Sequence, residues 1–288
     1  MFRTTLIAAT LSIAFAGAHA AQPLQVKVYN ADGNSFNVNS TLVYGEKEAM
    51  VIDAGFTRAD ALRIAANVLD SGKELKTIYV SQADPDYYFG VETLKEIFPT
   101  AEVVTTPAVL AKINAKLAGK IAFWGPKMGA NAPRTPVLPK AISGTTLTVD
   151  GQTVEIRGAT GALAHRPYAW IPSIKAVVGN IGVFGTNMHV WTADTQTVAE
   201  RSAWVAQLDE MAALQPAVVV PGHMPAGTAL DVTNVTYTKG YLQAFEKNAA
   251  AAKNSAELID AMKKAYPAAP MGLSLDIGAK VNKGEMKW

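Results

Sequence analysis

The apolar residues of this chain recur every second residue in some stretches and every third or fourth residue in others. Alternation with a period of two is typical of half-buried β-strands. It predicts strands in the first part of the chain at residues 24–28, 36–38, 41–44 and 50–52. These strands are separated by short polar turns, so we expect an antiparallel meander.

Apolar residues at helical spacing follow the meander and recur to the end of the chain. They predict helices at residues 57–71, 91–98, 107–117, 197–214, 233–253 and 256–266. Thr57 and Asp60 have the spacing of a capping box, which supports a helix start there. Residues 119–143 are rich in Pro and Gly and predict a surface loop, with a lid as the alternative.

Short β-branched runs lie between the predicted helices. They predict strands at residues 77–80, 103–104, 147–149, 154–156, 168–171, 176–178 and 217–220. Strands and helices thus occur in two similar halves, and each half brings a buried strand to a polar loop. This order predicts an α/β (α+β) protein in which two sheets pack face to face with helices outside, an αββα sandwich.

The first twenty residues have the pattern of a secretory signal peptide. Arg3 gives a short basic start, residues 6–17 are apolar, and residues 18–20 form a small-x-small cleavage site. The apolar run is too short to anchor a folded protein in a bilayer. We therefore expect a signal peptide at 1–20, one domain at 21–288 that ends in helices, and a periplasmic or secreted protein without stable membrane insertion.

Composition narrows the possible chemistry. The chain has 26 Lys and Arg against 24 Asp and Glu, a balance that gives no support for nucleic-acid binding. Cysteine is absent, which excludes disulfides and thiolate metal ligands. Loss of His19 with the signal peptide would leave His165, His189 and His223.

A polar loop after the strand at 77–80 concentrates the candidate chemistry. It reads Ser81-Gln82-Ala83-Asp84-Pro85-Asp86-Tyr87-Tyr88-Phe89-Gly90. This loop resembles the signature loop of the metallo-β-lactamase superfamily, His-x-His-x-Asp-His followed shortly by Gly. On that pattern Gln82 and Asp84 stand at the first two His positions, Asp86 matches the Asp, and Tyr87 stands at the third His.

Two further segments carry the same resemblance. Asp53-x-Gly55 is similar to the Asp that follows an early strand in the family, and Pro221-Gly222-His223 is similar to its late Gly-His. The resemblance implies a metallo-β-lactamase-like sandwich and a hydrolase with divalent metal. Its mid-chain His ligand is assigned here to His165, and Asn180 stands near its bridging Asp.

The resemblance implies a metal site made of Asp84, Asp86, His165 and His223. Gln82, His189 and Asn180 are possible additional ligands. The expected cofactor is one zinc ion, with manganese or iron as alternatives, since oxygen ligands harden a site. Metal-bound water would attack an ester, lactone or amide of a small-molecule substrate, with Asp86 or Asp84 as general base and Tyr87 as proton donor.

Other interpretations of these residues remain open. Asp84 before Pro85 also has the form of a plain helix start, Asp at the N-cap and Pro at the first position. The lost His residues favour a metal-free binding protein on the same fold. Two His and a carboxylate are also a non-haem iron arrangement. The sequence identifies neither the substrate nor the oligomeric state.

Overall fold

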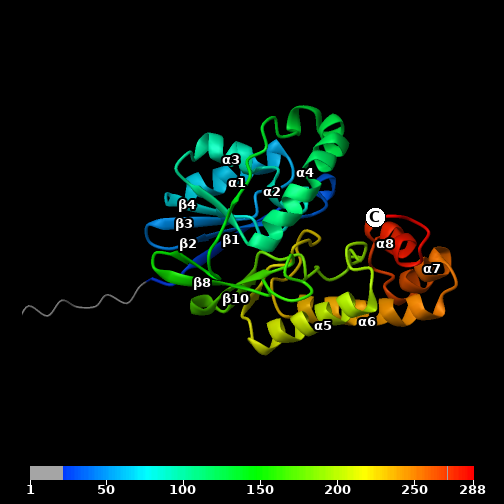
Figure 1. The fold of residues 1–288 in the computed structure, drawn as a ribbon. Coiled ribbons are helices and arrows are strands. Elements are labelled where there is room, and N and C mark those ends of the chain that lie inside the picture. The colour runs from blue at the N-terminus through cyan, green and yellow to red at the C-terminus, as the bar shows by residue number, and fades with distance from the viewer. Residues whose placement is uncertain (1–21, 271) are drawn as a thin grey trace, which may run out of the picture.

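The computed structural model describes residues 22–270 and 272–288. The predicted signal peptide at 1–20 lies outside the described residues. Two sheets pack face to face with helices on both outer sides, as Figure 1 shows with α1, α3 and α4 above and α5 and α6 below. The predicted αββα sandwich is confirmed.

The first sheet has the strand order β1-β2-β3-β4-β5-β6. Its strands are β1 (Gln25–Asn30), β2 (Asn39–Tyr44), β3 (Glu48–Ile52), β4 (Glu74–Tyr79), β5 (Glu102–Thr105) and β6 (Lys140–Ala141). The first three strands pair antiparallel, which confirms the meander, and the pairs from β3 to β6 are parallel. The parallel strands β4 and β5 deliver their following loops to one edge of the sheet.

The second sheet has the strand order β11-β10-β9-β8-β7. Its strands are β7 (Thr146–Val149), β8 (Gln152–Arg157), β9 (Tyr168–Ile171), β10 (Ala176–Val178) and β11 (Val218–Val219). The predicted hairpin at Asp150-Gly151 is present, and both turn residues have the positive φ that such a two-residue turn requires. Strand β11 runs parallel to β10 and leads into His223.

Eight α-helices are found in the described residues. They are α1 (Arg58–Ser71), α2 (Pro85–Tyr88), α3 (Val91–Ile97), α4 (Pro107–Met128), α5 (Val198–Ala213), α6 (Thr233–Ala251), α7 (Ser255–Ala265) and α8 (Leu273–Asn282). Capping boxes begin α1 at Thr57 and α5 at Thr197, because each Thr side chain accepts from the N3 backbone while the N3 acid accepts from the cap. A Thr and the acidic residue three positions later therefore determine where each of these helices begins.

Three apolar layers hold the sandwich together. One lies between the first sheet and α1, α3 and α4, a second lies between the two sheets, and a third lies between the second sheet and the C-terminal helices. Ile52 of β3 and Ile171 of β9 are both fully buried in the middle layer. Truncating such a residue to Ala costs about 2–5 kcal/mol.

Two element predictions are wrong, and one helix was not predicted. Residues 36–38 form no strand: Phe36 ends the 3-10 turn Gly33–Ser35 with φ 57°. The predicted loop at 119–143 begins as helix, because α4 continues to Met128 with Pro126 in its last turn. Leu117, Ile121, Trp124 and Met128 pack on the core of the first layer and offset the cost of the Gly and Pro residues. Helix α8 has no predicted counterpart.

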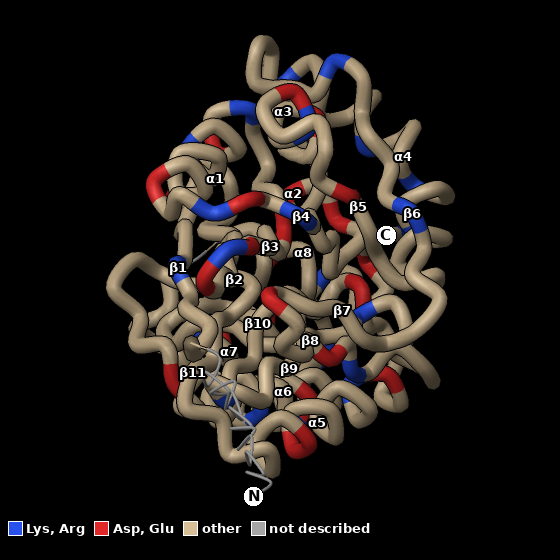
Figure 2. Tube along the Cα trace, turned by 90° about the vertical axis from the view of Figure 1, so that its left-hand side faces the viewer, with Lys and Arg blue, Asp and Glu red and all other residues tan. Residues whose placement is uncertain are grey.

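Charged residues of both signs are interspersed along the chain, as Figure 2 shows. No helix within residues 22–270 and 272–288 is long and apolar enough to cross a bilayer.

Candidate functional site

The loop after β4 places two acidic side chains at the junction of the layers. Asp84 is the N-cap of the one-turn helix α2, and Pro85 is its first residue, so the helix-start interpretation of this sequence is correct for the backbone. The Asp84 side chain makes no capping hydrogen bond. Its carboxylate lies 3.5 Å from the Lys120 ammonium of α4 instead.

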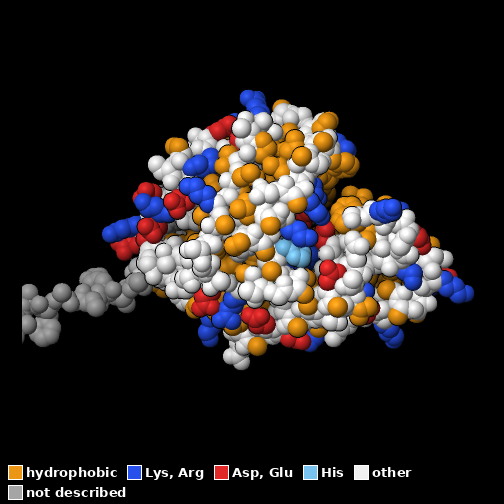
Figure 3. Space-filling view, in the orientation of Figure 1, with side chains coloured by type: hydrophobic (Ala, Val, Ile, Leu, Met, Phe, Trp, Pro, Cys, Tyr) orange, Lys and Arg blue, Asp and Glu red, His pale blue; other side chains and the backbone are white. Residues whose placement is uncertain are grey.

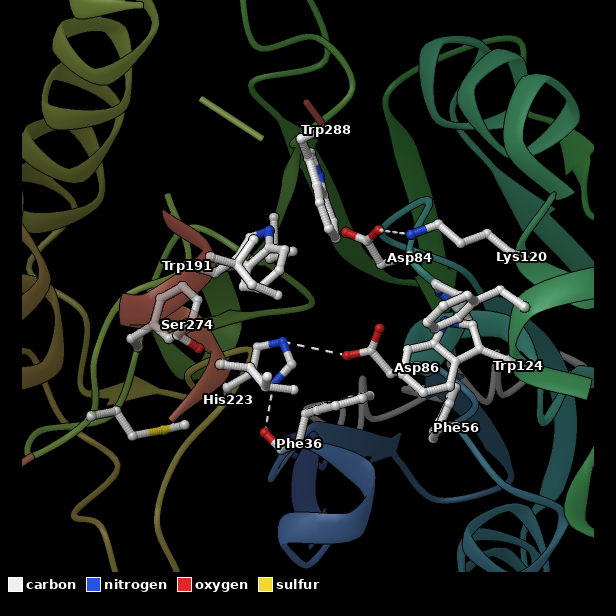
Figure 4. A pocket seen from close by; sticks show the side chains of 17 residues that line it. Phe36, Phe56, Asp84, Asp86, Lys120, Trp124, Trp191, His223, Ser274 and Trp288 are labelled. Atoms are coloured by element: carbon white, nitrogen blue, oxygen red, sulfur yellow. Dashed lines mark hydrogen bonds and ion pairs between the residues drawn. The ribbon is translucent and has the colours of Figure 1, made fainter. Parts of the chain in front are cut away.

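Asp86, in the first turn of α2, faces His223 from the second half of the chain. The Asp86 Oδ2 and His223 Nε2 atoms are 3.4 Å apart, and the close view in Figure 4 shows the two side chains pointing toward each other. Both residues are buried. The end of β11 positions His223, whose backbone bridges Val38 on one side and Phe184 on the other.

The orientation of the His223 ring follows from its surroundings. Nδ1 lies 2.9 Å from the Phe36 carbonyl oxygen, which can only accept, so Nδ1 carries a proton. The Phe184 ring stacks on the imidazole at 5.4 Å. Nε2 is therefore the free ring nitrogen and is directed at Asp86.

Burial sets the protonation of this pair. It lowers the pKa of His223 to about 4. It raises the pKa of Asp86 well above its ordinary value, and the charge of Asp84 adds to the increase. Two acceptors cannot face each other without a proton between them. Both pKa shifts therefore favour the uncharged forms of the pair, a protonated Asp86 and a neutral His223.

The pair lies in the wall of a cavity of about 300 Å³. The wall combines aromatic and aliphatic side chains with few polar ones. Its members include Phe36, Phe56, Lys120, Phe123, Trp124, Ile181, Phe184, Met188, Trp191, Leu273, Ser274, Ile277 and Trp288. We call this space the α4–α8 cavity, because those helices and Trp288 close it against the β4 loop.

Aromatic side chains pack against one another in the walls of the α4–α8 cavity. Trp124 packs edge-on against Phe36 at 5.6 Å and against Phe56 at 5.2 Å. On the opposite side the Trp191 and Trp288 rings are 5.1 Å apart. Both indole N–H groups donate to Asp194, at 2.6 and 2.9 Å. Such walls suit an apolar ligand.

A second, smaller pocket of about 40 Å³ adjoins the cavity, and Asp84 and Ile181 line both. The remaining lining residues of this small pocket are Gln82, Ala83, Lys112, Lys116, His165, Arg166 and Asp194. Gln82 donates to the Pro167 carbonyl at 2.9 Å, which fixes its amide. Burial and the charge of Lys112 lower the pKa of His165 to about 4.

The predicted metal ligands are divided between the two spaces. Asp86 and His223 line the α4–α8 cavity, His165 lines the small pocket, and Asp84 borders both. Across the described part of the chain, no three His, Asp or Glu side chains are grouped so that they can hold a metal ion. The predicted convergence of these four residues is therefore not found, because His165 lies with lysine and arginine side chains rather than with His223.

The other predicted site residues, Tyr87, Asn180 and His189, have contacts with neighbouring backbone and side-chain groups of the fold. The Tyr87 hydroxyl is fully buried and lies 3.4 Å from the Asn180 carbonyl. The Asn180 side chain donates to the Val220 carbonyl and accepts from the Val183 amide. His189 Nδ1 lies 3.0 Å from the Tyr241 hydroxyl. None of the three lines the α4–α8 cavity or the small pocket.

The side chains present at the site can be compared with the ligands that a catalytic zinc ion requires. Catalytic zinc has three protein ligands and one open position. Here only Asp86 and His223 face each other, and the Lys120 ammonium already neutralises the nearby Asp84 carboxylate. These residues do not make the ligand set of a catalytic zinc site.

Several residues of the site have no clear signal in the sequence. Lys120 lies in a segment predicted to be loop, Trp288 follows a helix that was not predicted, and Arg166 directly follows His165, to which the mid-chain ligand position is assigned. The sequence offers five aromatic residues as candidates for the wall of a substrate pocket, Tyr87, Tyr88, Trp124, Trp170 and Trp191. Trp124 and Trp191 line the cavity, and the other three do not. The one sequence signal that could have placed Lys120 on a helix is the helical spacing of apolar residues, which continues beyond residue 117 at Ile121, Trp124 and Met128.

Comparison with known proteins agrees with this architecture. Residues 33–174 match the model of the metallo-beta-lactamase superfamily. No curated protein matches the chain significantly. Metallo-beta-lactamases are found among similar solved structures. One from Pontibacter korlensis has 17% identity and a TM-score of 0.54, and the match covers 78% of this chain and 97% of that one.

A metallo-beta-lactamase family protein from Thermus thermophilus is also similar. It has 16% identity and a TM-score of 0.61, and the match covers 89% of this chain and 91% of that one. At these identities the structural similarity establishes the fold alone.

Proposed function

Because the chain belongs to the metallo-β-lactamase superfamily but lacks a grouped ligand set among its described residues, we propose that it binds a small apolar molecule without a catalytic metal. Superfamily membership supports a hydrolase-like function in general. Fold alone does not determine the reaction, which depends on the residues of the site.

The observation that carries the proposal is the α4–α8 cavity. Its volume of about 300 Å³ falls at the lower end of the range of small-molecule sites, about 300–1,000 Å³. Aromatic walls surround a few polar groups, the Asp84–Lys120 pair and the Asp86–His223 pair. A ligand with an apolar body and one polar group fits this distribution.

The first experiment is a thermal-shift and tryptophan-fluorescence screen of the mature protein against neutral apolar compounds of ten to fifteen heavy atoms. Three indoles line the cavity, so we expect binding to change their emission and to raise the melting temperature. Chelator should leave binding unchanged. Loss of binding on chelation would overturn the metal-free proposal.

The second candidate function is the metal-dependent hydrolysis of an ester, lactone or amide, at one zinc, manganese or iron ion. Its supporting observation is the orientation of His223. A metal-bound His commonly donates its other ring N–H to a backbone carbonyl, as His223 does to Phe36. The Asp86–His223 separation of 3.4 Å also equals the spacing of two ligands about 2.1 Å from a tetrahedral ion.

Elemental analysis separates the two candidates. Protein purified without chelator and its His223→Ala variant are compared for zinc, manganese and iron, and then assayed on aryl esters and lactones. About one equivalent of metal that is lost in the variant, together with turnover, would support hydrolysis. Absence of metal and turnover after reconstitution supports the binding protein.

We also propose that the protein is exported to the periplasm or secreted. The support is the signal-like pattern of residues 1–20, which lie outside the described residues. Intact mass of the protein recovered from the native host should correspond to a chain that begins at Ala21. An uncleaved chain in the cytoplasm would contradict export.

A further inference from the structure

The small pocket contains a buried arginine with unused hydrogen-bonding capacity. Arg166 is only 3% exposed, and its Nε–H has no hydrogen-bond partner in the part of the chain that the structure describes. One Nη2–H reaches the Ile181 carbonyl at 3.5 Å, which is long for a hydrogen bond. Arginine remains protonated in proteins, so a positive charge is buried here.

Burying a cation without a paired anion is costly. The guanidinium lies 4.3 Å from the centre of the Trp204 ring, a cation–π contact that offsets about 1–2 kcal/mol of the penalty. No carboxylate lies within ion-pair distance of Arg166 among residues 22–270 and 272–288. The unused donor is thus unusual for a buried charged group.

The carboxylates that border the pocket already have partners of their own. Asp194 accepts from two indoles and lies 3.7 Å from the Lys116 ammonium. Asp84 lies 3.5 Å from the Lys120 ammonium. Lys112 also lines the pocket, and no ion pair of its side chain occurs in the described residues. Within that part of the chain, neither Lys112 nor Arg166 has a carboxylate at ion-pair distance, and the charges of Asp194 and Asp84 act on Arg166 only from farther away.

We infer that the small pocket binds a carboxylate-sized anionic group, held by Arg166 and Lys112. One water needs about 10–15 Å³ of a cavity, so a pocket of about 40 Å³ has room for one such group. Charge-assisted hydrogen bonds to arginine are the strongest that a carboxylate makes in proteins. The anion completes the pairing of the buried guanidinium.

The location of the pocket indicates where the anion comes from. It shares Asp84 and Ile181 with the α4–α8 cavity. Figure 3 shows basic, acidic and histidine side chains together in a hollow beside hydrophobic ones. A ligand with its apolar body in the cavity can therefore present a carboxylate to Arg166. This assignment rests on the proposed binding function, and it narrows the ligand class to apolar carboxylic acids.

The experiment uses three probes with one skeleton: 4-phenylbutyrate, 4-phenylbutanol and 4-phenylbutylamine. Each is titrated into the mature protein by calorimetry, with acetate as a free-anion probe. We expect the acid to bind about tenfold more tightly than the alcohol, and the amine to bind more weakly than both. Saturable acetate binding that competes with the acid would place a free anion in the same site.

Lys112→Met tests the assignment without disturbing the core, because Lys112 is exposed on α4. We expect the acid to bind several-fold more weakly to this variant while the alcohol is unaffected. Lys247→Met is the matched control, since Lys247 is an exposed helical lysine that lines neither space. Arg166→Gln removes the buried charge itself, so it should weaken binding of the acid more than Lys112→Met does. The result counts only if the circular dichroism spectrum of the variant is native.

The outcomes separate this inference from the proposed function. Equal binding of acid and alcohol, or tighter binding of the amine, overturns the anion site and leaves the apolar cavity as a binding site. Absence of binding by all four probes counts against both. An acid preference that Lys112→Met and Lys247→Met reduce equally is a general charge effect and also overturns the anion site.

Discussion

The α4–α8 cavity and the small pocket adjoin at Asp84 but differ in almost every chemical respect. The cavity has aromatic walls, and burial favours the uncharged forms of its Asp86–His223 pair. The small pocket is lined by three basic side chains, Lys112, Lys116 and Arg166, together with Asp84 and Asp194. The family resemblance predicts one metal site in this region. The structure instead has two adjoining compartments, and we propose that one takes an apolar body and the other a negative charge.

The largest expected effect is on the pH dependence of stability, and it comes from Asp53, a buried carboxylate that lines neither compartment. It shows how strongly a buried carboxylate without a charged partner affects this fold. One oxygen of Asp53 accepts from the Ser81 amide, and the other accepts from the Ser81 hydroxyl at 2.8 Å. Burial raises the pKa of Asp53 to about 8. The folded state then binds more protons than the unfolded state, so stability falls as pH rises from about 4 to about 8, by a few kcal/mol.

Urea denaturation at pH 5 and pH 8 measures this change. Asn can mimic protonated Asp53, with its Oδ1 accepting from the Ser81 amide and its Nδ2 donating to the Ser81 hydroxyl oxygen, so Asp53→Asn should reduce the difference in stability between the two pH values. A variant whose pH dependence equals that of the wild type would mean that other groups cause it.

The next effect tests the apolar compartment. Trp124→Ala removes the ring that packs on Phe36 and Phe56. Loss of a central aromatic contact weakens binding by about 2 kcal/mol or more, so affinity for 4-phenylbutanol should fall at least about tenfold. The ratio of acid to alcohol affinity should stay the same. Leu69→Ala, at an exposed position of α1, is the control; a changed ratio would mean that the two compartments are coupled.

A smaller effect tests whether Asp86 is protonated beside His223. Asn at position 86 can donate to His223 Nε2 without a buried charge, so Asp86→Asn should raise the free energy of unfolding at pH 8 by about 1 kcal/mol. Chemical denaturation measures the change. Asp70→Asn, whose side chain is 70% exposed in a surface pair with Lys27, should have almost no effect. Destabilisation by Asp86→Asn would show that Asp86 is ionised and paired with a charged His223.

The smallest effect concerns the boundary between the compartments. The Asp84 and Lys120 side chains are 28% and 21% exposed, and pairs of this kind contribute about 0–1 kcal/mol. Lys120→Met should therefore change stability by less than about 1 kcal/mol, as measured by urea denaturation. A loss of several kcal/mol would mean that Asp84 depends on Lys120 far more than its exposure indicates.

The strands and capped helices could be predicted because local sequence determines them. Alternation identifies β1 and β2, Asp150-Gly151 identifies the hairpin, and Thr57 with Asp60 identifies the start of α1. The full length of α4 could not be predicted in this way. Its last turns contain Gly125 and Pro126, and the helix persists there because Trp124 and Met128 pack on a distant core.

The candidate site could be predicted only in part, for a related reason. Asp86 and His223 face each other, as the resemblance implies for two residues of one site. The functional residue in the middle of the chain could not be identified from the sequence. His165 and Arg166 are neighbours, and hydrophobic periodicity does not distinguish them. Burial and hydrogen bonding identify Arg166 as the residue with an unused donor.

The walls of the α4–α8 cavity come from opposite ends of the described chain, Phe36 on one side and Trp288 on the other. A molecule bound between them would join the first sheet to the last helix. We expect ligand to slow proteolysis and hydrogen exchange in α8 in particular, because release of that helix opens the cavity. Any polypeptide fused after Trp288 would begin at a residue that lines the cavity and would compete with the ligand for space.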